Sequence, residues 1–192
     1  LGIAVGISVM IFIGSLIEGL QDSLVDTTIG RSSHITVTSK EKNTPLDNYF
    51  KYEAQLRNDI SDFKSVSPSV GGPAFLFVEI NESTITEQIL VRGFEFSKAN
   101  LIYRFDDALT KGRLPEEFGE IAIGSGLSKD FGIETGAIVK FSTPGGENIN
   151  AKVVGIFDFK VSAINNSWVI STIEYISEIY KIPEGSASNI EI

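Results

Sequence analysis

The best candidate for a ligand-binding site is one glycine-rich stretch, GEIAIGSGLSKDFGIETGAIVKF, which covers Gly119–Phe141. A strand that turns through glycines into a helix is an arrangement that binds phosphate with backbone N–H groups. The dinucleotide-binding form requires G-x-G-x-x-G, but here Gly124 and Gly126 are followed by Lys129 where the third glycine belongs. The P-loop string G-x-x-x-x-G-K-[ST] occurs nowhere in the chain. The spacing therefore excludes both motifs, and we expect no cofactor.

The same glycines are explained by secondary structure alone. The alternation in EIAI predicts a strand, and Leu127 and Phe131 fall on one face of a helix predicted over residues 125–131. Gly132 suits the left-handed residue that follows a helix end. Gly136 then turns the chain into a predicted strand, AIVKF. The stretch is therefore predicted to be a strand-helix-strand unit rather than a ligand site.

Other catalytic chemistry has little support in the sequence. His34 is the only histidine, and it alternates away from Ile35 and Val37 in the stretch SSHITVTS. The absence of cysteine excludes disulfides and thiolate metal sites. Neither G-x-S-x-G nor H-E-x-x-H is present, and no carboxylates have the spacing of an acid and base pair. We therefore expect no catalytic residues, no metal and no enzymatic activity.

The charge balance argues against nucleic acid as a partner. The 192 residues include 16 Lys and Arg against 25 Asp and Glu, a formal net charge of -9. The basic residues are scattered and form no stripe, so a polyanion would be repelled over most of the surface.

The N-terminal segment predicts a transmembrane helix. Residues 1–17 carry no charge, and at about 1.5 Å per residue they reach about 26 Å, slightly short of a ~30 Å hydrocarbon core. Because the chain starts at Leu1 rather than Met, we expect the span to begin before it. A secretory signal, a buried core helix and an interfacial helix fit less well, because the segment has no basic n-region and no polar face. Gly2, Gly6 and Gly14 lie near one stripe, where a neighbouring helix could approach closely.

The helix is predicted to continue beyond the membrane as an amphipathic stalk up to residue 29. Its apolar face consists of Leu16, Leu20, Leu24 and Val25. The first basic residue is Arg31, and a flank without Lys or Arg is the kind that crosses the membrane. We therefore place the chain in the cell membrane, with residues after about 30 outside the cytoplasm.

Residues 30–192 are predicted to form an α+β domain, a mixed arrangement of hairpins and short helices in one lobe or two. In the two-lobe alternative, the inserted lobe covers about residues 68–110. A helix is predicted from Tyr49 to Phe63, and the glycines and prolines of SPSVGGPAF are expected to interrupt the regular structure. Two hairpins are predicted, one around NEST and one across Pro144–Gly146. The strand SWVIS, a helix over Ile173–Tyr180 and the strand SNIEI complete the domain. Asn81 and Asn165 each begin an N-x-S triplet, which matches the glycosylation pattern.

The order of these elements resembles a known family. The glycine-bearing helix runs into SLIEGLQDSL, and LVRGFE, KGRLP, the stretch from Gly119, AKVVGIF, WVISTIEYISEIY and SNIEI follow. This order is similar to the first membrane helix and extracytoplasmic core domain of ABC transporter permeases of the MacB, LolC/LolE and FtsX group. The resemblance extends over nearly the whole chain, although its separate motifs are glycines and apolar alternation rather than chemical signatures.

The resemblance implies a non-catalytic permease subunit. Its expected partners are a second permease copy, cytoplasmic ATP-binding subunits, membrane lipid, and an extracytoplasmic protein or lipoprotein. It also implies three further membrane helices that are absent from this sequence. ATP hydrolysis would move the outer domain to export lipoprotein, lipid, peptide or drug. Two other classes remain open: a membrane-anchored binding or FtsX-like regulatory module that recruits a partner without transport, and an ectoenzyme with an unrecognised site.

Overall fold

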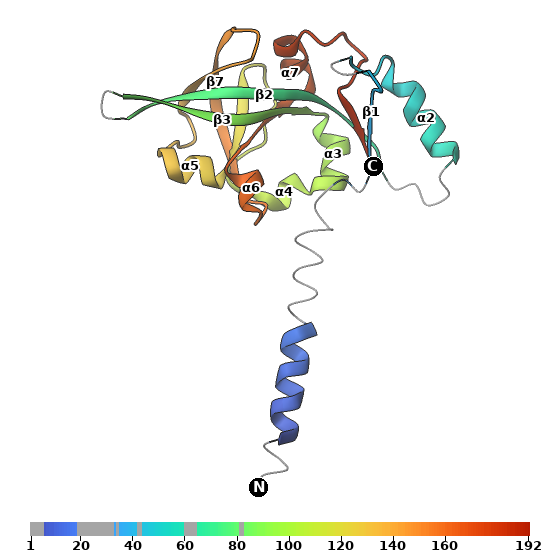
Figure 1. The fold of residues 1–192 in the computed structure, drawn as a ribbon, viewed down its shortest axis with the longest axis vertical. Coiled ribbons are helices and arrows are strands. Elements are labelled where there is room, and N and C mark those ends of the chain that lie inside the picture. The colour runs from blue at the N-terminus through green and yellow to red at the C-terminus, as the bar shows by residue number, and fades with distance from the viewer. Residues whose placement is uncertain (1–5, 19–32, 34, 42–43, 60–64, 81–82) are drawn as a thin grey trace.

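The computed structural model of the chain describes residues 6–18, 33, 35–41, 44–59, 65–80 and 83–192. Beyond the helix at residues 6–18, these residues form one nine-stranded sheet with helices packed on it (Figure 1). The strands are β1 (Thr36–Thr38), β2 (Ser67–Ile80), β3 (Ser83–Phe94), β4 (Leu109–Gly112), β5 (Glu120–Gly124), β6 (Ile138–Ser142), β7 (Asn148–Phe157), β8 (Trp168–Thr172) and β9 (Asn189–Glu191). The helices are α2 (Tyr49–Asp59), α3 (Phe96–Tyr103), α4 (Phe105–Ala108), α5 (Ser125–Phe131), α6 (Ser162–Asn165) and α7 (Ile173–Tyr180).

Six of the strands pair in a closed ring. β2 pairs with β3, β3 with β8, β8 with β5, β5 with β7, β7 with β6, and β6 returns to β2. The β3–β8 and β5–β7 pairs are parallel, and the other four are antiparallel. β9 and β1 extend the sheet from one end of β2, and β4 pairs with the last residues of β7.

Side-chain alternation divides the core between the two faces of this ring. Along β5, Ile121 and Ile123 join the main apolar cluster together with Leu76, Val91 and Phe141. Ala122 points to the other face, because successive side chains of a strand alternate. A second cluster there gathers aromatic rings from α3, α4 and the strands around them: Phe94, Tyr103, Phe105, Phe157 and Phe159. A third, smaller cluster lies under α2 around Leu46, Val66 and Ile190.

The mixed α/β character predicted from the sequence is confirmed, and several elements match their expected bounds. α5 and α7 cover the predicted residues 125–131 and 173–180. Both hairpins are present, as the β2–β3 and β6–β7 pairs. β8 and β9 also form where the apolar alternation indicated strands. The strands β2 and β3, within the predicted inserted lobe at residues 68–110, are hydrogen-bonded into the common sheet.

One expectation is wrong. The segment SPSVGGPAF does not interrupt the structure, because β2 runs through it as a 14-residue strand. Gly71 allows this, since its φ of 142° suits glycine and a Cβ there would lie 2.0 Å from the Val91 carbonyl oxygen. Pro73 is tolerated because, among the described residues, only β3 pairs with β2 at that position.

The N-terminal helix stands apart from the domain. Residues 6–18 are helical, and all of them are exposed. In Figure 1 this helix projects away from the sheet. Within the described residues, no helix combines the length and hydropathy needed to cross a membrane.

Candidate functional site

The site residues predicted from the sequence are not gathered in one place. Gly6, Gly14 and Leu16 lie on the helix of residues 6–18. Apart from the adjacent residues and the backbone of this helix, no described atom lies within 4 Å of a Cβ built on either glycine. Gly2, Leu20, Leu24, Val25 and His34 lie outside the described residues. Helix packing and the stalk therefore stay predictions.

The glycines of the Gly119–Phe141 stretch have a packing role. A Cβ on Gly124 would lie 2.2 Å from the Asn165 carbonyl oxygen, and a Cβ on Gly126 would lie 1.8 Å from Oδ1 of Asn166. Both glycines thus allow α5 and the end of α6 to approach closely. Gly132 and Gly136 have φ values of 65° and 94°, as turn positions after a helix and before a strand require.

Asn165, which begins one of the two glycosylation triplets, is buried. Its Nδ2 donates to Oδ1 of Asp158 at 2.7 Å, and its Oδ1 accepts from the Phe159 N–H at 3.0 Å. Both ends of the amide are therefore engaged in the folded domain. Asn81 lies outside the described residues.

The most distinctive arrangement lies where the first and last strands of the domain meet. β1 and β9 are antiparallel neighbours, with Val37 opposite Ile190. Ile35 and Ile192 extend this pairing through reciprocal backbone hydrogen bonds of 3.3 and 2.9 Å. Residues 35–38 and residues 189–192 therefore lie side by side.

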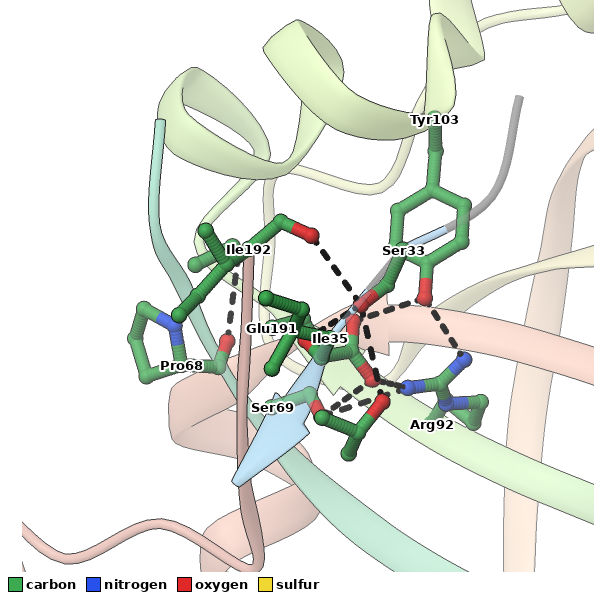
Figure 2. Close-up of polar contacts among 10 residues, drawn as sticks. Ser33, Ile35, Pro68, Ser69, Arg92, Tyr103, Glu191 and Ile192 are labelled. Carbon is green, nitrogen blue, oxygen red and sulfur yellow. Dashed lines mark hydrogen bonds and ion pairs between the residues drawn. The ribbon is translucent and has the colours of Figure 1, made fainter. Parts of the chain in front are cut away.

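A buried polar cluster attaches this pair of strands to the ring (Figure 2). Glu191 of β9 forms an ion pair with Arg92 of β3, and the side chains are 3% and 11% exposed. The Tyr103 hydroxyl donates to Oε2 of Glu191 at 2.7 Å, and the Ser69 hydroxyl donates to its Oε1 at 3.1 Å. Arg92 also donates to Tyr103 at 3.3 Å and to Ser69 at 3.2 Å. Every charged group in the cluster thus has several partners, as a buried ion pair requires.

Aromatic rings cover the guanidinium of Arg92. Its Cζ lies 4.4 Å from the ring centroid of Trp168, 4.6 Å from that of Phe94 and 5.7 Å from that of Tyr103. These rings exclude water and attract the cation. Burial raises the pKa of the Tyr103 hydroxyl, so it keeps its proton and donates to Glu191 throughout the physiological range.

This cluster has the features of a structural attachment and not those of a catalytic site. Arg92 and Glu191 satisfy each other, and Tyr103 stays protonated, so the cluster has no activated nucleophile or base. Within the described ranges, no three His, Asp or Glu side chains are placed to hold a metal ion. What the cluster does is bind β9, at one end of the domain, to strands β2 and β3. We call Ser69, Arg92, Tyr103 and Glu191 the strand-junction cluster.

The strand-junction cluster was not predicted from the sequence, although its two charged residues carry a signal. Arg92 and Glu191 are charged residues inside otherwise apolar strands, in LVRGF and NIEI. A buried charge in a strand usually has a partner of opposite sign. The sequence could not say which partner, since the two residues are 99 positions apart.

Comparisons with known proteins give the chain its family. The family model for the MacB-like periplasmic core domain matches residues 1–190. No curated protein sequence matches the chain.

Two solved structures are similar to the chain. The extracellular domain of the noncanonic ABC-type transporter YknZ from Gram-positive bacteria is 12% identical with a TM-score of 0.51, over 83% of this chain and 80% of that one. A domain of a protein named as a permease from Porphyromonas gingivalis is 13% identical with a TM-score of 0.47, over 71% of this chain and 63% of that one. The likeness to the YknZ domain reflects a shared fold. Because the family model covers nearly the whole chain, this protein belongs to the family of MacB-like periplasmic core domains.

Proposed function

We propose that this chain is the first membrane helix and extracytoplasmic domain of an ABC transporter permease, and that the domain transmits motion driven by ATP hydrolysis on separate cytoplasmic subunits. The observation that carries the proposal is the pairing of β1 with β9 and their attachment to the ring by the strand-junction cluster. A domain that is moved through its connections needs those connections fixed to its core. Otherwise an applied force would peel off a terminal strand instead of moving the domain.

The N-terminal helix supports attachment to the membrane. Its described residues expose apolar side chains on every face, including Met10, Ile11 and Phe12 at 79%, 65% and 67% exposure. A helix that is apolar all round is stable when lipid or other helices surround it. We infer that this segment lies in the cell membrane, that the domain lies outside the cytoplasm, and that a second permease copy packs on the stripe of Gly2, Gly6 and Gly14.

The family suggests the classes of cargo: lipoprotein, lipid, peptide or drug. The alternative is a membrane-anchored binding or regulatory module that recruits an extracytoplasmic partner without transport. The two functions differ in whether rotation of the domain relative to the membrane matters. A permease that transmits motion depends on this rotation, and a tethered binding module does not.

Alanine insertions in the predicted stalk test this difference. Each inserted helical residue turns the domain by about 100° and moves it by about 1.5 Å. Four alanines after Asp22 turn the domain by about 40° net and keep Leu24 near the face of Leu16 and Leu20, whereas two alanines turn it by about 200°. In the full-length permease with its ATPase, we expect the two-residue insertion to abolish function and the four-residue insertion to retain part of it.

The readout is complementation of a permease deletion in the native organism at matched membrane levels. It requires no knowledge of the cargo. Equal activity of the two insertion variants would overturn the transmission of motion and support a flexible tether that carries a binding module.

A further inference from the structure

The hairpin of β2 and β3 extends beyond the strands on either side of it, at the left of Figure 1. β6 pairs with β2 only at residues 75–77, and β8 pairs with β3 only at residues 90–94. β3 therefore has β2 on one side throughout. Among the described strands, it has no partner on its other side before Leu90.

Three residues of β3 direct both of their backbone groups toward this free side. The Leu90 N–H donates to the Ser167 carbonyl oxygen at 2.8 Å, so Leu90 faces away from β2. Backbone groups point to alternate sides along a strand, so Thr84, Thr86 and Gln88 also face away from β2. All three are exposed, and no described residue hydrogen-bonds to their backbone on this side. At about 3.4 Å per residue, the free edge is about 17 Å long.

This edge lacks most of the features that protect sheet edges. β1 is three residues long, and β4 is four residues long with an irregular register. Short length, irregularity, Pro and Lys all discourage the addition of another strand. Residues 83–89, STITEQI, contain no Pro, Gly or Lys, and their Thr and Ile residues favour strands. The edge of β3 is therefore suited to a further strand.

The side chains beside this edge favour a segment that alternates polar and apolar residues. Ile85 lies opposite Val78 and is 40% exposed. A residue added beside Ile85 would lie on the same face, so an apolar side chain there would cover it. The residues before and after that one would lie on the other face, beside Thr84 and Thr86. Polar or β-branched side chains suit these positions.

The charge of the hairpin favours a basic segment. Residues 74–91 include Glu79, Glu82 and Glu87 but no Lys or Arg, and the whole chain has a formal net charge of -9. An acidic segment would therefore be repelled. A cation placed opposite Glu87 would form a favourable cross-strand pair.

We propose that the free edge of β3 at residues 84–88 binds an extended, basic segment of another protein as an added strand. Backbone pairing provides the affinity. The apolar position beside Ile85 and the cationic position beside Glu87 provide the selectivity. This interaction is independent of coupling to ATP hydrolysis, and its test involves no transport.

The test attaches a peptide to the edge through a disulfide, because the chain has no cysteine of its own. Ser83→Cys supplies an exposed thiol at the start of β3. The probe is a capped peptide of threonine, lysine, threonine, valine, threonine and cysteine, in that order. In an antiparallel pairing its cysteine falls opposite position 83 in a non-hydrogen-bonded pair, where a Cα separation of about 4.5 Å suits a disulfide. Its valine and lysine then lie beside Ile85 and Glu87.

Amide exchange is measured residue by residue by NMR on residues 1–192 in detergent micelles. Attachment gives the peptide an effective concentration of about millimolar, so weak pairing is detected. We expect at least a tenfold slowing at Thr84, Thr86 and Gln88, because their N–H groups gain acceptors. Ile85 and Glu87 face β2 with or without the peptide, so their exchange should change less than twofold.

The matched control peptide is N-methylated at its threonines, which removes the pairing amides and keeps the side chains. We expect less than twofold slowing with it. Thr86→Pro removes an N–H that faces outward and should abolish the slowing at Thr84 and Gln88, whereas Thr86→Val keeps the N–H and should retain the slowing. A peptide with glutamate in place of lysine should slow exchange about threefold less. No slowing with the lysine peptide, or equal slowing with the N-methylated or the glutamate peptide, would overturn the proposal.

Discussion

Two arginine–glutamate pairs in this domain have the same chemistry and different roles. Arg92 and Glu191 lie 99 positions apart and join β3 to the last strand, with both side chains nearly inaccessible to water. Arg113 and Glu120 lie seven positions apart and close the loop before β5. There the guanidinium is 45% exposed and the carboxylate 6% exposed. The first pair determines how distant segments assemble, and the second stabilises a local turn.

Although Arg113 is exposed, the carboxylate of Glu120 is fully hydrogen-bonded. Glu120 accepts two hydrogen bonds from Arg113, at 2.8 and 2.6 Å, and two more from the Glu116 and Glu117 N–H groups, at 3.2 and 3.1 Å. The hydrogen bonds from Arg113 contribute most to lowering the pKa of Glu120 from 4.5 to about 2. From this difference we expect that burial of both partners, rather than the number of hydrogen bonds, decides how much stability is lost when one partner is removed.

The largest expected effect is at the strand-junction cluster. Glu191→Gln leaves Arg92 buried and unpaired, so we expect the free energy of unfolding to fall by about 3–5 kcal/mol. Arg92→Met combined with Glu191→Leu removes both charges and should cost less than Glu191→Gln alone. Urea denaturation of the three proteins measures this. A double variant that loses as much free energy of unfolding as Glu191→Gln, or more, would contradict a buried, mutually dependent pair.

A smaller effect is expected at the local pair. Glu120→Gln removes the charge but keeps an acceptor, so we expect a loss of about 1–3 kcal/mol at neutral pH. The stability of the wild type should fall at acidic pH. A carboxyl whose pKa is lowered on folding stabilises the folded state above its unfolded pKa. This stabilisation is lost as the pH falls from about 4.5 to about 2.

Denaturation measured between pH 6 and pH 2.5 should therefore show a shallower decline in Glu120→Gln than in the wild type. Glu117→Gln is the matched control, because its side chain is exposed and only its backbone contacts Glu120. An unchanged slope in Glu120→Gln would show that other carboxyl groups dominate the acid response.

The smallest effect is expected for Tyr103→Phe, which keeps the ring and removes the hydrogen bond donated to Glu191 and the longer one accepted from Arg92. We expect a loss of about 1 kcal/mol at neutral pH. Burial raises the pKa of Tyr103, so the folded state holds a proton that the unfolded state releases above about pH 10. Stability should therefore decline above that pH, and less steeply in the variant. Tyr52→Phe serves as the control, because the phenol of Tyr52 is not in the cluster. An equal change in the two variants would show that Tyr103 does not cause the decline in stability at alkaline pH.

Much of the local structure could be predicted from the sequence because its causes are local. The apolar spacing of Leu127 and Phe131 and the turn at Gly132 define α5 within eight residues. The β6–β7 hairpin likewise depends on neighbouring residues and on the proline-glycine turn at Pro144–Gly146. Where a distant contact intervened, the prediction failed. β2 passes through Gly71 and Pro73 because β3 supports one side of it along its length.

By itself, the sequence determined the class of the domain, its apolar N-terminal helix, its hairpins and its family, since periodicity and turn residues act over a few positions. Only the tertiary structure decided that β1 meets β9, that Arg92 meets Glu191, and that β3 keeps a free edge before the start of β8. Each of these depends on residues brought together across tens of positions by packing. A single sequence shows that a charged residue or a glycine is present, but it does not identify the distant residue that contacts it. That partner depends on which strands become neighbours when the ring of strands closes.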